Sequence, residues 1–236
     1  MPDTLSIIIP AYNEAENVPV VLRRVREVEL PYGMDKQVIV VDDGSCDKTL
    51  AKAEEYKDSH PQEDITLLHH DRNIGKGAAV RTALPYVKGI YTVIQDSDNE
   101  LDPADFVPML KKMIGEGHDV VYGSRFLNNN NQRLYRRFYY GVRFLSFLTN
   151  VLYRQHITDE ATCYKMFRTP LLRSLPLKCT GFEFCPEVTA RVSRLGVKIV
   201  EVPVSYSPRT MAQGKKVRLK DGLMAVWTLL RYRFSR

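Results

Sequence analysis

The stretch Tyr91–Glu100, which reads YTVIQDSDNE, decides the fold of this chain. Its first four residues are all β-branched or aromatic, a composition typical of a buried strand. Polarity rises abruptly at Gln95, and carboxylates follow at Asp96 and Asp98. Because alternate residues of an extended chain face the same way, this spacing predicts that both carboxylates project to one side. Two neighbouring carboxylates repel each other unless a proton or a cation lies between them.

Carboxylates at the end of a strand favour a hard divalent cation. Mg²⁺ and Mn²⁺ prefer oxygen ligands, and in proteins they usually keep positions open for substrate phosphates. A simpler interpretation is a polar loop in which Asp98 or Asn99 caps the next turn. For an Asp-x-Asp pattern taken alone, the simpler interpretation is the better one, so the other motifs of the chain must decide.

Four apolar runs alternate with helix-like segments in the first hundred residues. The runs are Leu5–Ile9, Val38–Val41, Ile65–Leu68 and Tyr91–Ile94, and helices are expected at Asn17–Glu29, at Asp47–Lys57 and late in residues 69–84. Each run is predominantly apolar, with at most one Ser or Thr, rather than alternating with polar residues. Such runs predict a parallel sheet that is covered by helices on both faces.

Polar motifs follow all four runs, at the points where the strands are expected to end. The motifs are Tyr12-Asn13-Glu14, Asp42-Asp43, Asp71 and the pair Asp96/Asp98. In parallel sheets of this kind, ligands bind at the carboxyl ends of the strands. The four motifs together therefore predict a nucleotide site at one edge of the sheet, and they favour the metal-binding interpretation of Asp96 and Asp98.

The second half of the chain predicts further alternation and one ambiguous helix. Its expected elements are a helix from Asp102 to Ile114, a strand at Val120–Tyr122, a helix at Leu134–Tyr153, a strand near Tyr164–Phe167, a helix from Cys185 to Leu195, a strand at Ile199–Val202 and a helix at Leu223–Tyr232. In the Leu134–Tyr153 helix, Phe144, Phe147 and Val151 broaden the apolar face. This breadth suits either a core helix or an amphipathic helix at a membrane surface.

Composition narrows the classes of partner. The 236 residues carry a net charge of +6 with a pI near 9.1, which favours an anionic partner such as a phosphorylated substrate, an acidic membrane or nucleic acid. Basic residues cluster in 133–154 and 209–236, beside aromatic residues rather than in a recognised nucleic-acid-binding motif, so nucleic acid is not expected. The four cysteines lack metal-ligand spacing and are expected to be free, buried thiols of a reducing compartment. Neither a signal peptide nor a membrane span is expected, and the predicted location is cytoplasmic.

The segments SIIIPAYNEAENV, VIVVDDGSCDKT, DRNIGKGAAVRTAL, QDSDNE and YGSRF together resemble the family 2 glycosyltransferases. Within that family the chain is similar to the polyprenyl-phosphate branch typified by dolichol-phosphate mannose synthase. The segments TDEATCYKMFR, GFEFCPEVTARVSRLG and VEVPVSYSPRT extend the resemblance over nearly the whole chain. It implies an α/β GT-A fold, a Rossmann-like, mostly parallel sheet with helices on both faces and a mixed acceptor-side region.

The resemblance also implies a domain organisation and an activity. Residues 1–236 would form a single domain, with the nucleotide-sugar-binding half in 1–125 and the acceptor-binding, membrane-facing half in 126–236. The implied activity is an inverting transfer of a hexose, foremost mannose from GDP-mannose, to a polyprenyl or dolichyl phosphate. Direct displacement would give a β-linked product from an α-linked donor.

Individual roles follow from the same resemblance. Nucleotide-sugar contacts are expected from Pro10, Ala11, Tyr12, Glu14, Asp42, Asp43, Asp71, Lys76 and Asp96. The ligands of Mg²⁺ or Mn²⁺ are expected to be Asp96 and Asp98, with Glu100 as a third. Acceptor phosphate is expected to bind Ser124, Arg125, Arg136 and Arg137. The expected catalytic set is Asp96, Asp98, Arg125, Arg137 and Asp159.

Asp159 leaves two interpretations open. In relatives with hydroxyl acceptors it would be a general base, whereas here it is expected to orient an arginine or the acceptor phosphate, and a purely structural role fits equally well. A lipid phosphate is already anionic at neutral pH and can attack without a base. The competing functions are a UDP-glucose- or UDP-N-acetylhexosamine-dependent polyprenyl-phosphate transferase, a family 2 transferase acting on a hydroxyl, and a catalytically silent nucleotide-sugar-binding subunit.

Two basic segments suggest contacts outside the sheet. The loop Pro208–Lys216 suits either a lid over the donor diphosphate or a solvated loop. The C-terminal segment with Trp227 and Tyr232 suits contact with an anionic membrane or with a small membrane-anchoring subunit. The expected partners are thus a nucleotide-sugar donor, a polyprenyl phosphate and the cytoplasmic face of a membrane, to which the protein would bind peripherally.

Overall fold

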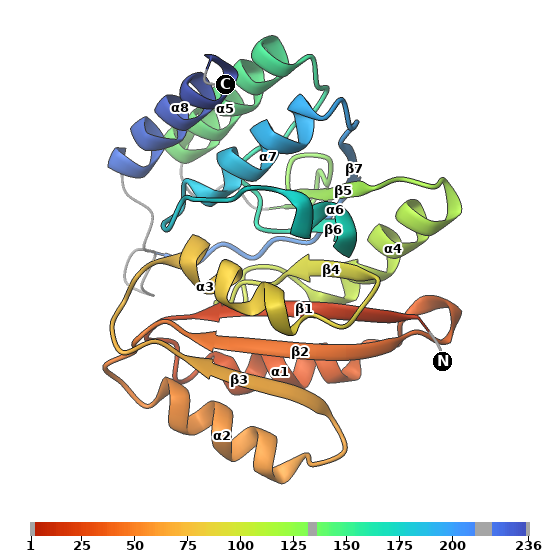
Figure 1. Cartoon of the computed structure of the whole chain (residues 1–236), viewed down its shortest axis with the longest axis vertical. Coiled ribbons are helices and arrows are strands. Elements are labelled where there is room, and N and C mark those ends of the chain that lie inside the picture. The colour runs from red at the N-terminus through yellow and green to blue at the C-terminus, as the bar shows by residue number, and fades with distance from the viewer. Residues whose placement is uncertain (1–2, 132–135, 211–218, 235–236) are drawn as a thin grey trace.

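The computed structural model describes residues 3–131, 136–210 and 219–234. Within them, a seven-stranded sheet has the order β3-β2-β1-β4-β6-β5-β7 (Figure 1). The strands are β1 Thr4–Ala11, β2 Asp35–Asp42, β3 Asp64–His69, β4 Tyr91–Ile94, β5 Val120–Ser124, β6 Lys165–Arg168 and β7 Val200–Pro203. The α-helices are α1 Val18–Glu27, α2 Thr49–Ser59, α3 Lys76–Ala83, α4 Phe106–Gly115, α5 Arg136–Tyr153, α6 Thr169–Ser174, α7 Phe184–Arg194 and α8 Leu219–Phe234. Short 3₁₀ turns occur at Pro31–Gly33, Leu84–Tyr86 and Pro103–Asp105.

The sheet is parallel on the nucleotide side and mixed on the other side, as predicted. Strand β1 pairs in parallel with β2 and β4, and β2 pairs in parallel with β3. Strand β6 runs antiparallel between β4 and β5, and β7 returns parallel to β5. The chain therefore has the α/β architecture of a Rossmann-like half joined to a mixed half.

Helices cover both faces of the sheet, which explains why its strands are predominantly apolar. Ile7 and Ile9 of β1 pack into the core beneath α1, α2 and α4, whereas Ile8 packs into the opposite core beneath α3, α6 and α7. All three isoleucines are fully buried. Successive side chains of one strand thus enter different cores, and neither face of the strand meets water.

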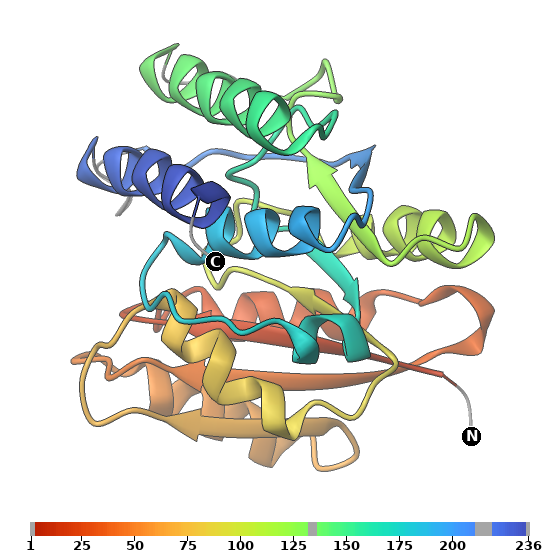
Figure 2. The same cartoon turned by 45° about the horizontal axis from the view of Figure 1, so that its top comes forward.

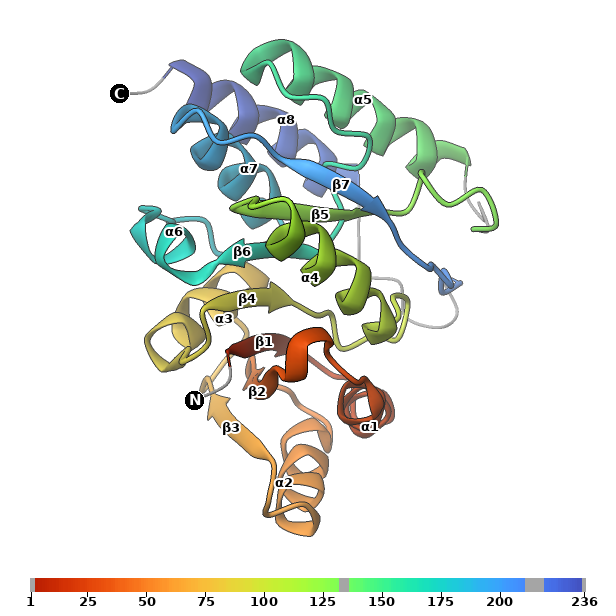
Figure 3. The same cartoon turned by 90° about the vertical axis from the view of Figure 1, so that its right-hand side faces the viewer.

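Helices α5 and α8 form an outer layer on α7 (Figures 1 and 2). Leu145 and Tyr153 of α5 and Leu229 and Tyr232 of α8 share a small hydrophobic core with Ala190 of α7. The Tyr153 hydroxyl donates to the Leu229 carbonyl at 2.6 Å. This layer lies beyond the mixed half of the sheet, on the side away from β3 (Figure 3).

Several expected boundaries differ from the structure. The helix expected from Asp102 is preceded by a 3₁₀ turn, in which the Asp102 carboxylate accepts from the Ala104 amide, and α4 begins only at Phe106. Helix α6 was not predicted, and α8 is longer than expected. The expected start of α5 at Leu134 lies outside the described residues. All four cysteines are free, but Cys46 is exposed rather than buried, since it lies in the polar turn after β2.

Candidate active site

The polar motifs of the first half meet at one edge of the sheet. The arrowheads of β1, β2, β3 and β4 point to the same side in Figure 1. Ala11 lies opposite Asp42, and Asp42 lies opposite His69, so three strands end side by side. The Asp43 amide donates to the Ala11 carbonyl at 2.8 Å, which extends this alignment past the strand ends. The predicted convergence of the motifs is therefore present.

Asp96 and Asp98 lie close together, but each faces a different cation. Strand β4 ends at Ile94, and the chain turns at Ser97 and Asp98 instead of staying extended. Asp96 forms an ion pair with the Lys76 ammonium, and Asp98 forms one with Arg209 at 3.1 Å. The Asp98 carboxylate also accepts from the Glu100 amide at 3.1 Å. Asp98 therefore caps this turn, as the simpler interpretation of the sequence predicted.

The pKa values of the two acids move in opposite directions. Burial disfavours the charged form of Asp96, but the Lys76 ammonium outweighs it and holds the Asp96 pKa below its ordinary value. Burial, followed by the neighbouring Asp96 and Glu100 carboxylates, raises the pKa of Asp98 to about 7. Asp98 thus lies where negative charge accumulates and where an added cation would be stabilised.

Arg209 gathers the remaining acids of the site. Its Nη1 lies 3.1 Å from both Glu14 oxygens, and its Nε lies 3.8 Å from Glu100. The expected third metal ligand, Glu100, also accepts from the Arg209 amide at 2.9 Å. In the described part of the chain, no three His, Cys, Asp or Glu side chains converge as a ready-made metal shell. Arg209 provides the positive charge for Asp98, Glu100 and Glu14 instead.

Asp42 and Asp43, adjacent in sequence, have different surroundings. Asp43 accepts from the amides of Ile74 and Gly75 and contacts the His70 ring at 2.7 Å, so it fixes the loop that leads to Lys76. One Asp42 oxygen contacts the His69 ring at 2.8 Å, whereas the other is buried and has no hydrogen-bond partner among the described residues. The two histidines thus lie at and just beyond the end of β3 and contact these carboxylates. This second Asp42 oxygen can therefore accept a hydrogen bond from a ligand.

The glycines beside Lys76 serve close packing rather than a phosphate loop. A Cβ at Gly75 would lie 2.5 Å from the Thr180 carbonyl oxygen, and one at Gly77 would lie 2.6 Å from the Cys179 carbonyl oxygen. The Ala78 amide donates to the Thr180 carbonyl at 2.9 Å. The first turn of α3 therefore rests directly on the segment before α7, and this contact positions Lys76 against Asp96.

On the acceptor side, Arg125 and Asp159 form a buried bidentate pair. Arg125 Nε and Nη2 each lie 2.7 Å from a different Asp159 oxygen, and the Arg125 amide also donates to this carboxylate. The Asp159 side chain is fully buried. Glu201 accepts from the Thr158 and Asp159 amides and so holds the segment in place. Asp159 thus orients Arg125, one of the two roles left open by the sequence.

Other expected site residues have different surroundings. Ser124 is buried, and its hydroxyl lies 2.6 Å from that of Thr158, so it is engaged within the protein. Arg136 and Asp71 are exposed. The side chain of Arg137 lies outside the described residues. Pro10, Ala11 and Tyr12 lie at or just beyond the end of β1.

Sequence reasoning missed two contributors to the site. Arg209 was placed only in a basic loop, although the acids it contacts lie about a hundred residues or more away in the chain. Cys163 hydrogen-bonds to Asp96, and burial raises its thiol pKa well above the ordinary value. The excess of carboxylates in the predicted site was the one signal that a further cation was needed.

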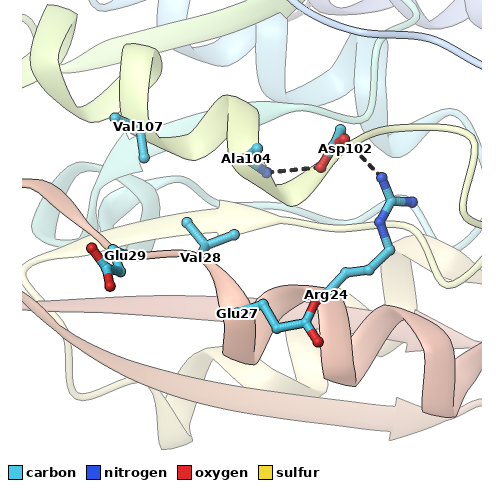
Figure 4. A pocket seen from close by; sticks show the side chains of 7 residues that line it. All are labelled: Arg24, Glu27, Val28, Glu29, Asp102, Ala104 and Val107. Carbon is cyan, nitrogen blue, oxygen red and sulfur yellow. Dashed lines mark hydrogen bonds and ion pairs between the residues drawn. The ribbon is translucent and has the colours of Figure 1, made fainter.

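A separate cavity of about 490 Å³ lies between α1 and the turn before α4 (Figure 4). Arg24 and Asp102 form an ion pair of 2.9 Å at its rim. Its lining residues are Arg24, Glu27, Val28, Glu29, Asp102, Ala104 and Val107. Glu14, Asp42, Asp96, Asp98 and Glu100 do not belong to this lining, so the cavity is distinct from the candidate site.

Three proteins of similar sequence match most of this chain. A dolichyl-phosphate beta-glucosyltransferase of Trichomonas vaginalis, ALG5A, is 28% identical over 240 residues, which cover 96% of this chain and 72% of the relative. A second such enzyme of that organism, ALG5D, is 27% identical over 243 residues with the same two coverages. An uncharacterized protein of Methanocaldococcus jannaschii is 28% identical over 226 residues, or 91% of this chain and 87% of its own.

Solved structures share the fold. Glucosyl-3-phosphoglycerate synthase from Mycobacterium tuberculosis in complex with UDP superimposes with a TM-score of 0.73 at 21% identity, covering 98% of this chain and 80% of that chain. Mannosyl-3-phosphoglycerate synthase from Rubrobacter xylanophilus gives 0.69 at 17% identity, covering 98% and 73%. These enzymes are glycosyltransferases of the GT-A fold, and the expected fold class is confirmed.

The family model for glycosyl transferase family 2 matches residues 6–175, well over half of the chain. This span contains most of β1, all of β2 to β6, and with them Asp42, Asp96, Arg125 and Asp159. With the parallel half, the acidic strand ends and the fold all in agreement, the chain belongs to glycosyl transferase family 2.

Proposed function

We propose that this protein is an inverting transferase that moves a hexose from a nucleotide sugar to a polyprenyl phosphate. The observation that carries the proposal is the bidentate pair between Arg125 and Asp159. Both Asp159 oxygens are engaged by Arg125, and the side chain is fully buried. A carboxylate in this state is unsuited to take a proton from an incoming hydroxyl.

The other acids of the site support the same view. Asp96 is paired with Lys76, whereas Asp98, Glu100 and Glu14 all contact Arg209. A hydroxyl acceptor usually needs a general base within hydrogen-bond reach, whereas a phosphate monoester is already ionised at neutral pH. Because each of these four carboxylates contacts a cation, this part of the site favours an acceptor that arrives as an anion.

Arg125 is the residue best placed to receive that anion. Burial works against its charge, but the Asp159 carboxylate more than compensates and raises the Arg125 pKa, so the guanidinium stays charged. Asp159 fixes its orientation through Nε and Nη2. In the proposed reaction a phosphate oxygen bonds to the anomeric carbon while the bond from that carbon to the donor diphosphate breaks. Arg125 would hold the attacking phosphate without protonating it.

Donor binding is proposed at the ends of β1, β2 and β4. The unpartnered Asp42 oxygen can accept an N–H from a base, and Lys76 can contact a diphosphate. Asp96, Asp98 and Glu100 lie close together and suit a divalent cation, since burial, followed by the repulsion among these carboxylates, raises the Asp98 pKa to about 7. Bound there, Mg²⁺ or Mn²⁺ would neutralise charge on the leaving diphosphate.

UDP-glucose is the donor we place ahead of GDP-mannose. Two of the relatives are named as dolichyl-phosphate beta-glucosyltransferases, and the Mycobacterium synthase has been crystallised with UDP and Mn²⁺ or Mg²⁺. The chain contains the expected motifs of the polyprenyl-phosphate branch for either hexose. In this proposal residues 1–125 bind the donor and residues 126–236 bind the acceptor.

Helices α5 and α8 provide a surface through which a lipid acceptor could be reached. Phe144 and Phe147 of α5 and Trp227 of α8 are 55%, 63% and 60% exposed. With Tyr140, Val151, Leu223 and Phe234 they form outward stripes at helical spacing, opposite the residues that each helix buries. We call these seven residues the outer apolar stripes.

The surroundings of the outer apolar stripes favour an anionic bilayer as their partner. Arg143 on α5, Arg154 just after α5, and Arg231 and Arg233 on α8 are exposed. Aromatic side chains flanked by arginines are typical of helices that lie in the headgroup region. In the described part of the chain, no helix is long and apolar enough to cross a membrane. We therefore propose peripheral binding, on the cytoplasmic face.

A matched screen tests the proposed function. The chain is incubated with Mn²⁺ or Mg²⁺, a short polyprenyl phosphate, and radiolabelled UDP-glucose, GDP-mannose or UDP-N-acetylglucosamine in parallel. We expect label to enter the lipid fraction, because Asp159, Asp96 and Asp98 are engaged by Arg125, Lys76 and Arg209. Transfer should be most rapid from UDP-glucose, the donor proposed above. Transfer to 3-phosphoglycerate or to a sugar hydroxyl, with none to the lipid phosphate, would contradict the proposal.

Asp159→Asn separates an orienting role from a basic one. The amide NH2 of asparagine, a donor, replaces one of the two acceptor oxygens that hold Arg125, so we expect kcat/KM for the lipid phosphate to fall about 100-fold through misalignment. UDP affinity, measured by calorimetry, should stay within a factor of about two of wild type. As a control, Asp119→Asn removes the surface pair with Arg168 and should leave both quantities unchanged.

The pH profile completes this test. The acidic limb of turnover should follow the second ionisation of the acceptor phosphate, near pH 6, in wild type and in Asp159→Asn alike. Loss of that limb, or its displacement in the variant alone, would identify Asp159 as a base and overturn the proposed acceptor class.

Vesicle sedimentation tests the outer apolar stripes. Phe147→Glu and Trp227→Glu together place two carboxylates where we propose contact with the headgroups, so binding to vesicles containing anionic lipid should fall at least about tenfold. Tyr86→Glu is the matched control, because Tyr86 is also half exposed but lies in the turn after α3. Equal binding by the double variant and the control would exclude this surface.

A further inference from the structure

One described segment, residues 205–209, connects the donor-side acids to the acceptor-side arginine. Its Ser205 amide donates to Asp105 at 2.7 Å, and its Ser207 amide donates to the Glu100 carbonyl at 2.8 Å. Tyr206 forms an isolated antiparallel bridge with Leu101. We call residues 205–209 the strap. It follows β7 directly, so one end of the strap is anchored in the sheet.

The strap ends in a cation that occupies the centre of the acidic cluster. The Arg209 guanidinium contacts Glu14, Asp98 and Glu100 with three different nitrogens, at 3.1, 3.1 and 3.8 Å. Only 15% of its side chain is exposed. Arg209 therefore links three carboxylates that come from two different loops, one after β1 and one after β4.

Charge counting shows that this arrangement is incomplete. Three carboxylates and one guanidinium leave two negative charges uncompensated in a largely buried site. That excess equals the charge of one divalent cation. Arg209 and a metal ion would, however, compete for the same oxygens of Asp98 and Glu100, since a carboxylate oxygen that binds a metal gives up much of its capacity to accept from an arginine.

We propose that Arg209 is a resident counter-cation, which holds Asp98 and Glu100 in the metal-free protein and is exchanged for the divalent ion when donor binds. This inference rests on the proposed function, because it takes Asp98 and Glu100 as metal ligands. The displaced guanidinium would then be available to the donor diphosphate, for which a planar, permanently charged fork is well suited.

Exchange of Arg209 for a metal ion would also affect the acceptor side of the site. The Tyr206 ring lies 5.2 Å from the Arg125 guanidinium carbon, within the range of a cation–π contact. Release of Glu100 by the Arg209 amide would loosen the strap that carries this ring. The arrangement thus predicts that donor and metal bind before the acceptor, because Tyr206 leaves Arg125 only after the strap has moved.

Direct metal titration provides the first test. Mn²⁺ binding to the full chain without nucleotide is measured by electron paramagnetic resonance, in wild type and in Arg209→Gln. Removal of the competing guanidinium should tighten Mn²⁺ binding about tenfold. Arg24→Gln is the control, because it also removes one positive charge but from the Asp102 pair beside the separate cavity, and its Mn²⁺ affinity should match wild type.

Hydrogen exchange of the unsubstituted chain provides the second test, which does not depend on how well a variant folds. Exchange of the Ser207 and Arg209 amides, both bonded to Glu100, should accelerate at least about fivefold when Mn²⁺ and UDP are added. The Ala104 amide, bonded to Asp102, serves as an internal reference and should not change.

The outcomes distinguish this proposal from the metal site on which it rests. If Mn²⁺ binds wild type and Arg209→Gln equally, with unchanged exchange at Ser207 and Arg209, the metal site stands and the role of Arg209 is refuted. If Mn²⁺ binds neither protein, with or without UDP, Asp98 and Glu100 are not metal ligands and both proposals fail.

Discussion

Charge compensation at the carboxyl edge of the parallel strands is the constraint on which the rest of the site depends. The ends of β1 and β4 bring Glu14, Asp96, Asp98 and Glu100 into one partly buried region, where uncompensated carboxylates are costly. Lys76 from α3 and Arg209 from beyond β7 offset part of this negative charge. Both cations come from outside the motifs that carry the acids.

This constraint links the two halves of the molecule. Lys76 can reach Asp96 because the first turn of α3 rests on the segment before α7, which Gly75 and Gly77 permit. Arg209 can reach Asp98 because the mixed half of the sheet directs β7 toward the same edge. The proposed ligands would exchange partners with these ion pairs: a metal ion would bind the carboxylates, and a diphosphate and an anionic acceptor would bind the basic side chains.

The sequence was sufficient for the parallel half of the fold because that half is encoded locally. Predominantly apolar runs such as Leu5–Ile9 can only be strands with both faces covered, and the polar residues after each run then must meet at one edge. The direction of β6 was not encoded in this way: Lys165–Arg168 packs antiparallel between β4 and β5, a choice made by tertiary pairing. Helix α6 is too short for its periodicity to be recognised.

The candidate site, like the fold, could be predicted only in part from the sequence. Asp42, Asp96 and Asp98 were predicted because their motifs follow strands, whereas Arg125 was predicted from the family resemblance. The pairing of these residues was not predictable, since Arg125 meets Asp159 and Asp98 meets Arg209 across 34 and 111 positions of the chain. Ser124 matched the expected motif, yet its hydroxyl is engaged by Thr158, a contact that no local pattern reveals.

The proposed function requires that the acids after β4 hold a divalent cation beside a nucleotide diphosphate. Anomalous diffraction from a crystal of this protein grown with UDP and Mn²⁺ would locate that cation. We expect one strong manganese peak within coordination distance of Asp98 and of the UDP diphosphate, with Asp96 and Glu100 beside it. A manganese peak elsewhere in a crystal that contains UDP, with Asp98 still paired only to Arg209, would contradict this expectation.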